Sequence, residues 1–146
     1  MKGLIQRVSH AKVTVDGATV GEIGGGILLL LGVEKDDTPE QANKLLEKVL
    51  KYRIFSDDDG KMNRSLTDIG GGLLIVSQFT LVADTRKGLR PSFSSGAPPV
   101  LGEELYQTFV AKAQAIHSGT VATGQFGADM KVSLLNDGPV TFMLDV

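Results

Sequence analysis

The first part of the chain carries a hydrophobic pattern typical of β-strands. Apolar residues are spaced as in strands over residues 2–15, and Asp16-Gly17, a dipeptide typical of tight hairpin turns, separates them from a further strand over residues 18–23. A continuous apolar run then covers residues 27–31, which is typical of a strand buried on both faces. We therefore expect the chain to open with antiparallel strands and to continue into a buried one.

The pattern changes to that of a helix after this buried strand. Thr38 is a suitable N-cap residue, Pro39 suits the first helical position, and Gln41 supplies the second partner of a capping box. Four apolar residues follow at helical spacing, and they are expected to form the buried stripe of the helix: Leu45, Leu46, Val49 and Leu50.

A pattern of isoleucine, three glycines and an apolar run occurs at residues 23–30 and again, after 46 residues, at 69–76. An amphipathic helix is predicted after each copy, the second over residues 101–117 with Leu105, Phe109 and Ile116 on one face. The simplest interpretation is two related strand-helix units.

The remaining segments complete the expected fold. Strands are predicted over residues 121–125, 130–135 and 140–144, with residues 136–139 as a turn between the last two. We predict an α/β fold in which two strand-helix units and flanking antiparallel strands form a curved, barrel-like sheet with helices on one side. A chain of 146 residues suits a single domain, here residues 1–146.

The residue composition argues against several kinds of functional site. The chain has no cysteine and only two histidines, His10 and His117, so disulfides, thiol nucleophiles and a histidine-based metal centre are not expected. The glycine triplets lack the spacing of a dinucleotide site and the lysine of a phosphate loop. We expect neither a metal nor a cofactor.

Charge and hydropathy bear on location and partners. The longest apolar run, residues 27–33, is far shorter than the roughly 18 residues that span a bilayer, and no signal-peptide pattern precedes it. A cytoplasmic protein without a membrane partner is expected.

Because the net charge is −2, a nucleic acid would need a local basic patch, and the one tight cluster is Arg86, Lys87 and Arg90. The cluster is either a solvated loop or a phosphate-binding site.

Two short segments are candidates for a functional site. Ser77, Gln78, Phe79 and Thr80 follow a strand predicted to be buried, where each polar group needs a partner or a ligand. The Gly138-Pro139 peptide favours a rigid backbone corner, because proline lowers the cost of a cis bond to about 0.5 to 1 kcal/mol. Both segments also have a purely structural interpretation. The polar groups of residues 77–80 can simply bond to the adjacent loop, and residues 136–139 can be a plain turn.

These segments, SQFTL at 77–81 and NDGPVT at 136–141, together with LIQRVSHAKVTV at 4–15, resemble the D-aminoacyl-tRNA deacylase family over essentially the whole chain. The resemblance implies an enzyme that cleaves D-amino acids and glycine from tRNA and rejects L-aminoacyl-tRNA. It also implies a homodimer with each site at the subunit interface, and no DNA partner.

The resemblance further assigns roles to residues. Ser77, Gln78, Phe79 and Thr80 would line the catalytic pocket of one subunit. Gly138 and Pro139 of the other subunit, joined by a cis bond, would form the chirality gate beside Asn136, and Arg7 would support this corner.

Three interpretations of the chemistry remain open at this stage. An aminoacyl ester is already activated, so backbone amides near Phe79 and Thr80 can hold the oxyanion while the 2′-hydroxyl of the tRNA's terminal ribose activates water. Alternatively, Thr80 or Ser77 is a nucleophile, although no activating base is evident. The third interpretation is a non-catalytic RNA-binding module that stacks bases on Phe79.

Overall fold

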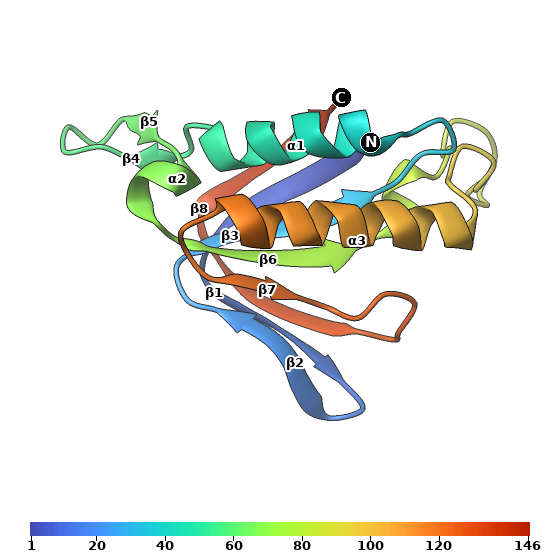
Figure 1. Cartoon of the computed structure of the whole chain (residues 1–146), viewed down its shortest axis with the longest axis horizontal. Helices are drawn as coiled ribbons and strands as arrows, with labels where there is room; N and C mark the ends of the chain where they lie inside the picture. The colour runs from blue at the N-terminus through green and yellow to red at the C-terminus, as the bar shows by residue number, and fades with distance from the viewer.

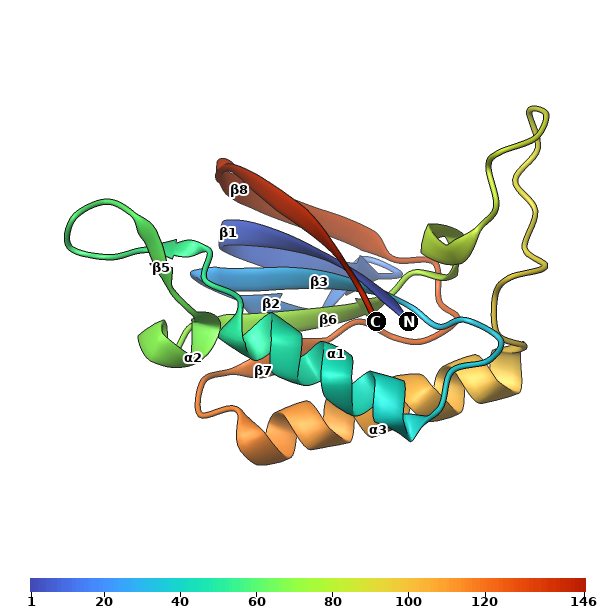
Figure 2. The same ribbon diagram turned by 90° about the horizontal axis from the view of Figure 1, so that it is seen from above.

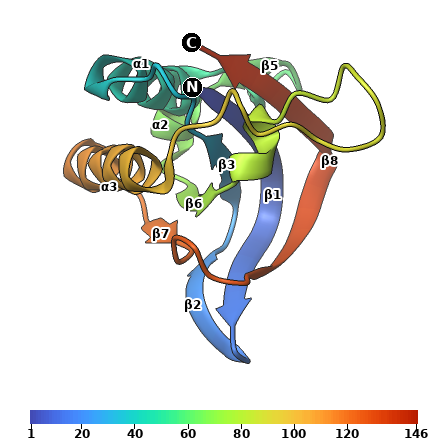
Figure 3. The same ribbon diagram turned by 90° about the vertical axis from the view of Figure 1, so that its right-hand side faces the viewer.

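The structure is a computed structural model that describes all residues, 1–146. Its helices and strands are β1 (Lys2–Val15), β2 (Ala18–Ile23), β3 (Gly26–Gly32), α1 (Pro39–Lys51), β4 (Phe55–Ser56), β5 (Met62–Arg64), α2 (Leu66–Ile69), β6 (Gly72–Ser77), the 3-10 helix η1 (Phe79–Val82), α3 (Pro99–Ile116), β7 (Val121–Thr123) and β8 (Lys131–Asp145). Figures 1 and 3 show the helices gathered on one side of a strongly curved sheet. The predicted α/β class and the one-sided helices are confirmed.

The sheet is organised around the long strand β1. Along one edge, the first half of β1 pairs with β3 and the second half pairs with β2, both antiparallel, while β8 follows the other edge over almost its whole length. The hairpin turn between β1 and β2 is at Asp16-Gly17, as predicted, and both residues have positive φ. The sheet continues from β3 to β6 and β7.

The two copies of the repeated pattern pair with each other. Strands β3 and β6 are parallel, and Gly26 lies opposite Gly72, so the 46-residue offset of the sequence is also the register of the ladder. Alternate residues of each strand enter two cores: Leu29 and Ile75 face the helices, whereas Leu28 and Leu74 lie inside the curved sheet. Burial on both faces explains the uninterrupted apolar runs.

The curved sheet nearly closes where β2 approaches β7. A Cβ atom added at Gly21 would lie 2.1 Å from the carbonyl oxygen of Thr123, so only glycine allows this approach. The closure fixes β7, and with it the connection from β7 to β8 that forms one wall of the site described below.

The first long helix has the predicted start and buried face. Thr38 and Gln41 form the capping box, in which the Thr38 amide donates to the Gln41 side chain at 2.8 Å. All four predicted stripe residues are buried.

The second long helix, α3, differs in its last turn. Leu105 and Phe109 are buried as predicted, but Ile116 is 54% exposed. That prediction is wrong because the helix ends at Ile116, and the next residue, His117, turns inward instead, with its Nε2 atom 2.7 Å from the carbonyl oxygen of Gly71.

The largest difference from the sequence-based prediction lies near the C-terminus. Residues 136–139 are not a turn between two strands: they belong to β8, which runs without reversal from Lys131 to Asp145. The β1–β8 register shifts between Gln6 and His10, which absorbs the local irregularity while the strand keeps its direction. The strand predicted over residues 121–125 is present but shorter, as β7, which ends at Thr123.

No helix of the structure is long and apolar enough to cross a membrane.

Candidate functional site

A cleft of about 510 Å³ opens at the carboxyl ends of β3 and β6. Its walls come from the end of β6, from one side of α3 and from the β7–β8 connection, and most of its lining is apolar. Ser77, Gln78 and Phe79 lie on one side of it, facing residues of the other two elements: Tyr106, Phe126 and Met130. Ligands commonly bind at this edge of parallel strands.

The segment from Ser77 to Thr80 is held at the mouth of this cleft by backbone bonds. The Gln78 amide donates to Leu31 O at 2.8 Å, which ties the segment to the end of β3, and the chain then enters η1. The Gln78 side-chain amide donates to the Thr80 hydroxyl. Phe79 is 67% exposed, and its ring centroid lies 5.2 Å from that of Phe93. Thr80 is exposed beside the cleft and does not line it.

The sequence analysis missed the residues of the opposite wall. Tyr106 donates a hydrogen bond to Ile75 O at 3.1 Å, and its ring lies 5.7 Å from that of Phe126. Burial raises the pKa of the Tyr106 phenol to about 12, so the hydroxyl stays protonated at neutral pH. Tyr106 follows the core residue Leu105 on the buried face of α3, and for this reason no sequence signal distinguishes it from a core residue.

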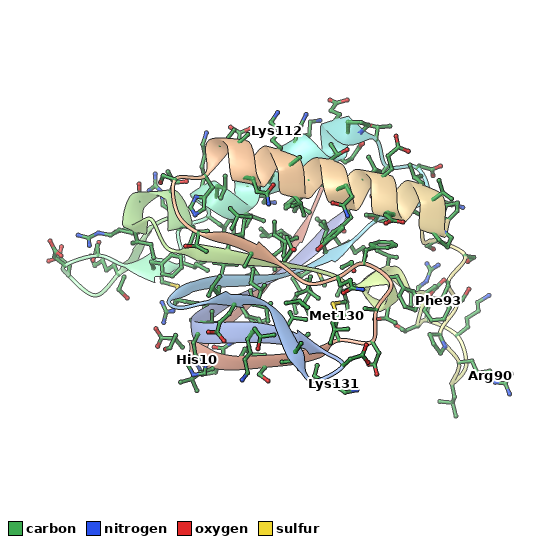
Figure 4. All side chains as sticks on the ribbon, turned by 60° about the horizontal axis from the view of Figure 1, so that its bottom comes forward. His10, Arg90, Phe93, Lys112, Met130 and Lys131 are labelled. Atoms are coloured by element: carbon green, nitrogen blue, oxygen red, sulfur yellow. The ribbon has the colours of Figure 1, made fainter.

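A carboxylate also lines the cleft. Asp129 lies in the β7–β8 connection, where its oxygens are 3.2 Å from Lys131 Nζ, and both side chains are largely exposed. Figure 4 shows Met130 and Lys131 together in this part of the molecule. The only charged group lining the cleft is therefore solvated and paired.

The Gly-Pro corner, residues 136–139, is built mainly from backbone. The Gly138–Pro139 bond is cis, as the family resemblance implies. Arg7 donates from Nε to Asp137 O at 2.8 Å and from Nη1 to Ile54 O at 2.7 Å, and the Asn136 side chain accepts from the Val140 amide at 2.8 Å. These bonds fix both flanks of the corner while Gly138 and Pro139 remain exposed.

The corner and the 77–80 segment are far apart within one chain. Val8 lies opposite Asn136 on one side and Gly26 on the other, and Gly26 lies opposite Gly72 at the start of β6. Ser77 is five residues further along, which at about 3.3 Å per residue is roughly 16 Å. Neither Gly138 nor Pro139 lines the cleft. One chain therefore does not bring the two motifs together.

The histidines are also remote from the cleft. His117 contacts Gly71, at the amino end of β6, and His10 is exposed on β1 opposite Leu135 of β8 (Figure 4). No histidine is therefore available to activate Ser77 or Thr80.

The predicted basic cluster lies on the loop after η1, next to the cleft. Arg86 is paired with Asp84, with Nε and Nη2 at 2.9 and 2.8 Å from its carboxylate oxygens. These hydrogen bonds hold the pKa of Asp84 well below its usual range. Lys87 and Arg90 have no acidic partner and are exposed. The loop thus presents two uncompensated cations.

Comparison with known proteins gives consistent matches. A family model described as D-Tyr-tRNA(Tyr) deacylase matches residues 4–145. A D-aminoacyl-tRNA deacylase of Pseudomonas entomophila (strain L48) is 64% identical over 146 residues, with 100% of both chains covered, and one of Teredinibacter turnerae (strain ATCC 39867 / T7901) is 65% identical over 145 residues, with 99% of both covered.

Two solved structures have a similar fold. The c-Myc DNA Unwinding Element Binding Protein has a TM-score of 0.94 at 38% identity, covering 100% of this chain and 99% of that one. A probable eukaryotic D-amino acid tRNA deacylase has a TM-score of 0.86 at 19% identity, covering 99% of this chain and 98% of that one, a likeness that concerns the fold alone.

Proposed function

Since the chain belongs to the D-Tyr-tRNA(Tyr) deacylase family and is a hydrolase of aminoacyl-tRNA esters, we propose that it acts as a cytoplasmic homodimer on D-aminoacyl-tRNA and glycyl-tRNA. Each site combines the 77–80 segment of one subunit with the Gly-Pro corner of the other. L-aminoacyl-tRNA is rejected at the corner.

The observation that carries this proposal is the separation of the two motifs. Within one chain the corner, on β8, is level with the start of β6, whereas the 77–80 segment follows the end of β6, roughly 16 Å away along the strand direction. A substrate ester is far smaller than this distance, so a single chain offers either the cleft or the corner but not both. Pairing two chains around a twofold axis supplies both motifs to two equivalent sites.

The surface of β8 supports the pairing of chains. This strand pairs only with β1, so its other edge is open, and it carries large apolar side chains that are exposed in the single chain: Leu135 (53%), Phe142 (38%) and Met143 (49%). Long apolar edge strands are normally covered in a stable protein. The Gly-Pro corner lies within the same strand, so covering β8 with a second copy brings the corner to the interface.

The cleft suits the terminal nucleoside of the tRNA. It adjoins Ser77, Gln78 and Phe79, where the ester must lie. Its opposite wall offers the rings of Tyr106 and Phe126 and the side chain of Met130, against which a flat base can pack. With the base in the cleft, the ribose lies at its mouth beside the 77–80 segment. The exposed Phe79 and Thr80 stand next to the ester linkage.

Catalysis then relies on position and on the substrate's own hydroxyl. The first amides of η1 have no acceptor within that short helix, so those of Phe79 and Thr80 are suited to bind the developing oxyanion. No histidine lies near them, and Thr80 already accepts from Gln78. The 2′-hydroxyl of the terminal ribose activates the attacking water.

Stereochemistry is judged by the Gly-Pro corner. Its flanks are fixed by Arg7 and Asn136, and its exposed backbone holds the substrate's amino group where an L side chain would project. A D side chain points toward solvent, so its identity matters little. Glycine has a hydrogen atom at both the D and the L side-chain positions, so the corner does not reject glycyl-tRNA.

Mixed dimers test the shared site. Subunits inactivated in the 77–80 segment, by Phe79→Ala, are refolded together with subunits inactivated at the corner, by Gly138→Ala. We expect hydrolysis of D-Tyr-tRNA to return to about a quarter of the wild-type rate, since half of the dimers are mixed and each has one intact site. Failure to regain activity, with mixed dimers verified by mass, contradicts the proposal, and binding of the RNA without release of amino acid contradicts the enzymatic function.

A further inference from the structure

A loop that projects beside the cleft is the most prominent surface feature outside the two motifs. Residues 84–92, here called the basic loop, extend away from the body of the molecule (Figures 2 and 3). Asp84 and Ser92 close its base with two backbone hydrogen bonds of 2.7 and 3.0 Å. These bonds hold the two ends of the loop side by side.

The base of the loop is close to the 77–80 segment. The loop begins two residues after Val82, the last residue of η1, and Phe93, the first residue beyond its base, packs its ring 5.2 Å from that of Phe79. Further along, Ala97 and Pro99 line the cleft. The loop is thus held at the cleft's mouth on the side of Phe79.

The charges of the loop are divided unequally. Arg86 is neutralised by Asp84 near the base. Lys87 and Arg90 flank the tip without an acidic partner, and between them Leu89 is fully exposed. Figure 4 shows Arg90 at the end of the loop, with Lys112 on the distant helix α3. The two positive charges at the tip are therefore free to bind an anionic group of another molecule.

We propose that Lys87 and Arg90 bind backbone phosphates of the nucleotides that precede the terminal one, and that Arg86 does not take part. This rests on the proposed function, which places the terminal nucleoside in the cleft. The four residue-to-residue steps from Asp84 to Gly88 span at most about 14 Å, so the tip reaches phosphates just outside the cleft. Two cations on an exposed, otherwise uncharged tip bind a phosphate backbone whatever its sequence.

The test compares a substrate with these phosphates and one without them. Lys87→Gln/Arg90→Gln is assayed on D-Tyr-tRNA and on the 3′-ester of D-tyrosine with adenosine, which has no phosphate. We expect kcat/KM on the tRNA to fall roughly tenfold through KM, with a log–log salt dependence flatter by about 1 to 2. Hydrolysis of the adenosine ester is expected to be unchanged.

Two control variants isolate the tip. Lys48→Gln/Lys112→Gln removes the same charge from exposed positions of α1 and α3, and Asp84→Asn/Arg86→Gln removes the internal pair without changing net charge. Both are expected to retain the wild-type salt dependence.

Several results would overturn the proposal. They are an equal loss on both substrates, an unchanged salt dependence on tRNA, or a change in oligomeric state in the Lys87→Gln/Arg90→Gln variant, which would assign the tip to the subunit interface. If the wild-type enzyme cleaved neither substrate, the proposed function itself would fail, whereas cleavage of both with no effect of the tip would refute this inference alone.

Discussion

At the carboxyl end of β6 the 77–80 segment exposes side chains over an apolar cleft, whereas at the other end of the sheet the Gly-Pro corner exposes backbone. In the first region one hydrogen bond, from the Gln78 amide to Leu31 O, ties the segment to another element, and the Gln78 side chain bonds within the segment to Thr80. The second is fixed on both flanks by Arg7 and Asn136. A cleft that must admit a nucleoside leaves space, while a gate that must exclude one enantiomer needs a surface that does not move.

The comparison also shows where substitutions act. Changing a side chain at the cleft removes a contact and leaves the backbone in place. Adding atoms at the corner moves the backbone itself, because Gly138 has a φ of 153° and its added Cβ would lie 2.7 Å from the Val140 amide nitrogen. The following predictions test this difference, beginning with the largest expected effect.

The chemistry at the cleft is expected to depend more on the substrate's hydroxyl than on Thr80. A D-Tyr-tRNA ending in 2′-deoxyadenosine should react about 10²- to 10⁴-fold more slowly, the usual contribution of positioned proton transfer. Thr80→Ala should change the single-turnover rate on normal D-Tyr-tRNA far less. The reverse order, with Thr80→Ala nearly inactive and the deoxy substrate cleaved normally, would establish Thr80 as the nucleophile and end the present mechanism.

At the corner, Gly138→Ala is expected to lower hydrolysis of D-Tyr-tRNA and of Gly-tRNA together, by about 100-fold, the cost of displacing a positioning group by about 1 Å. L-Tyr-tRNA should remain a poor substrate. Rates on the three substrates measure this directly.

A second glycine provides the control for this substitution. An added Cβ at Gly24 meets nothing within 4 Å, so Gly24→Ala should retain all activities. Rapid cleavage of L-Tyr-tRNA by the wild type, or its clean rejection of Gly-tRNA, would disprove the rejection gate.

The smallest expected effect concerns Tyr106 in the cleft wall. Tyr106→Phe removes the hydrogen bond to Ile75 O, which also accepts from the Gly124 amide, so a loss of about 1 kcal/mol in the free energy of unfolding is expected with little change in kcat.

The pH dependence of stability checks the same residue. Because burial raises the folded-state pKa of Tyr106 from 10.0 to about 12, the unfolded chain loses this proton first. The resulting stability is complete below about pH 10 and is lost as pH rises through 12. Urea unfolding across this range should show a smaller decline in Tyr106→Phe than in the wild type, and parallel curves would show that the phenol has no such effect.

Much of the fold was predictable because local patterns and tertiary structure agree. The hairpin at Asp16-Gly17, the capping box at Thr38 and Gln41, and the buried runs of β3 and β6 each follow from residues close together in the sequence. The pairing of β3 with β6 was not predicted, although the 46-residue offset of the repeated pattern is also the register of their ladder.

The predictions that were wrong concern residues whose environment is set by distant segments. Residues 136–139 have the composition of a turn, yet the chain continues in β8 because β1 pairs with β8 on both sides of them, Val8 with Asn136 and Gln6 with Thr141. Ile116 fits the apolar face of α3, yet it is exposed since His117 fills the position toward Gly71.

For the site, the sequence by itself determined the two motifs, the buried strand that ends at Ser77 and, through resemblance, the family. Only the tertiary structure decided that Tyr106, Phe126 and Met130 form the opposite wall of the cleft, that Arg86 is neutralised by Asp84, and that the corner, on β8, is level with the start of β6 and not with its end. The physical reason is that a residue's chemical type is local, whereas its distance from another group depends on the pairing of strands far apart in the chain.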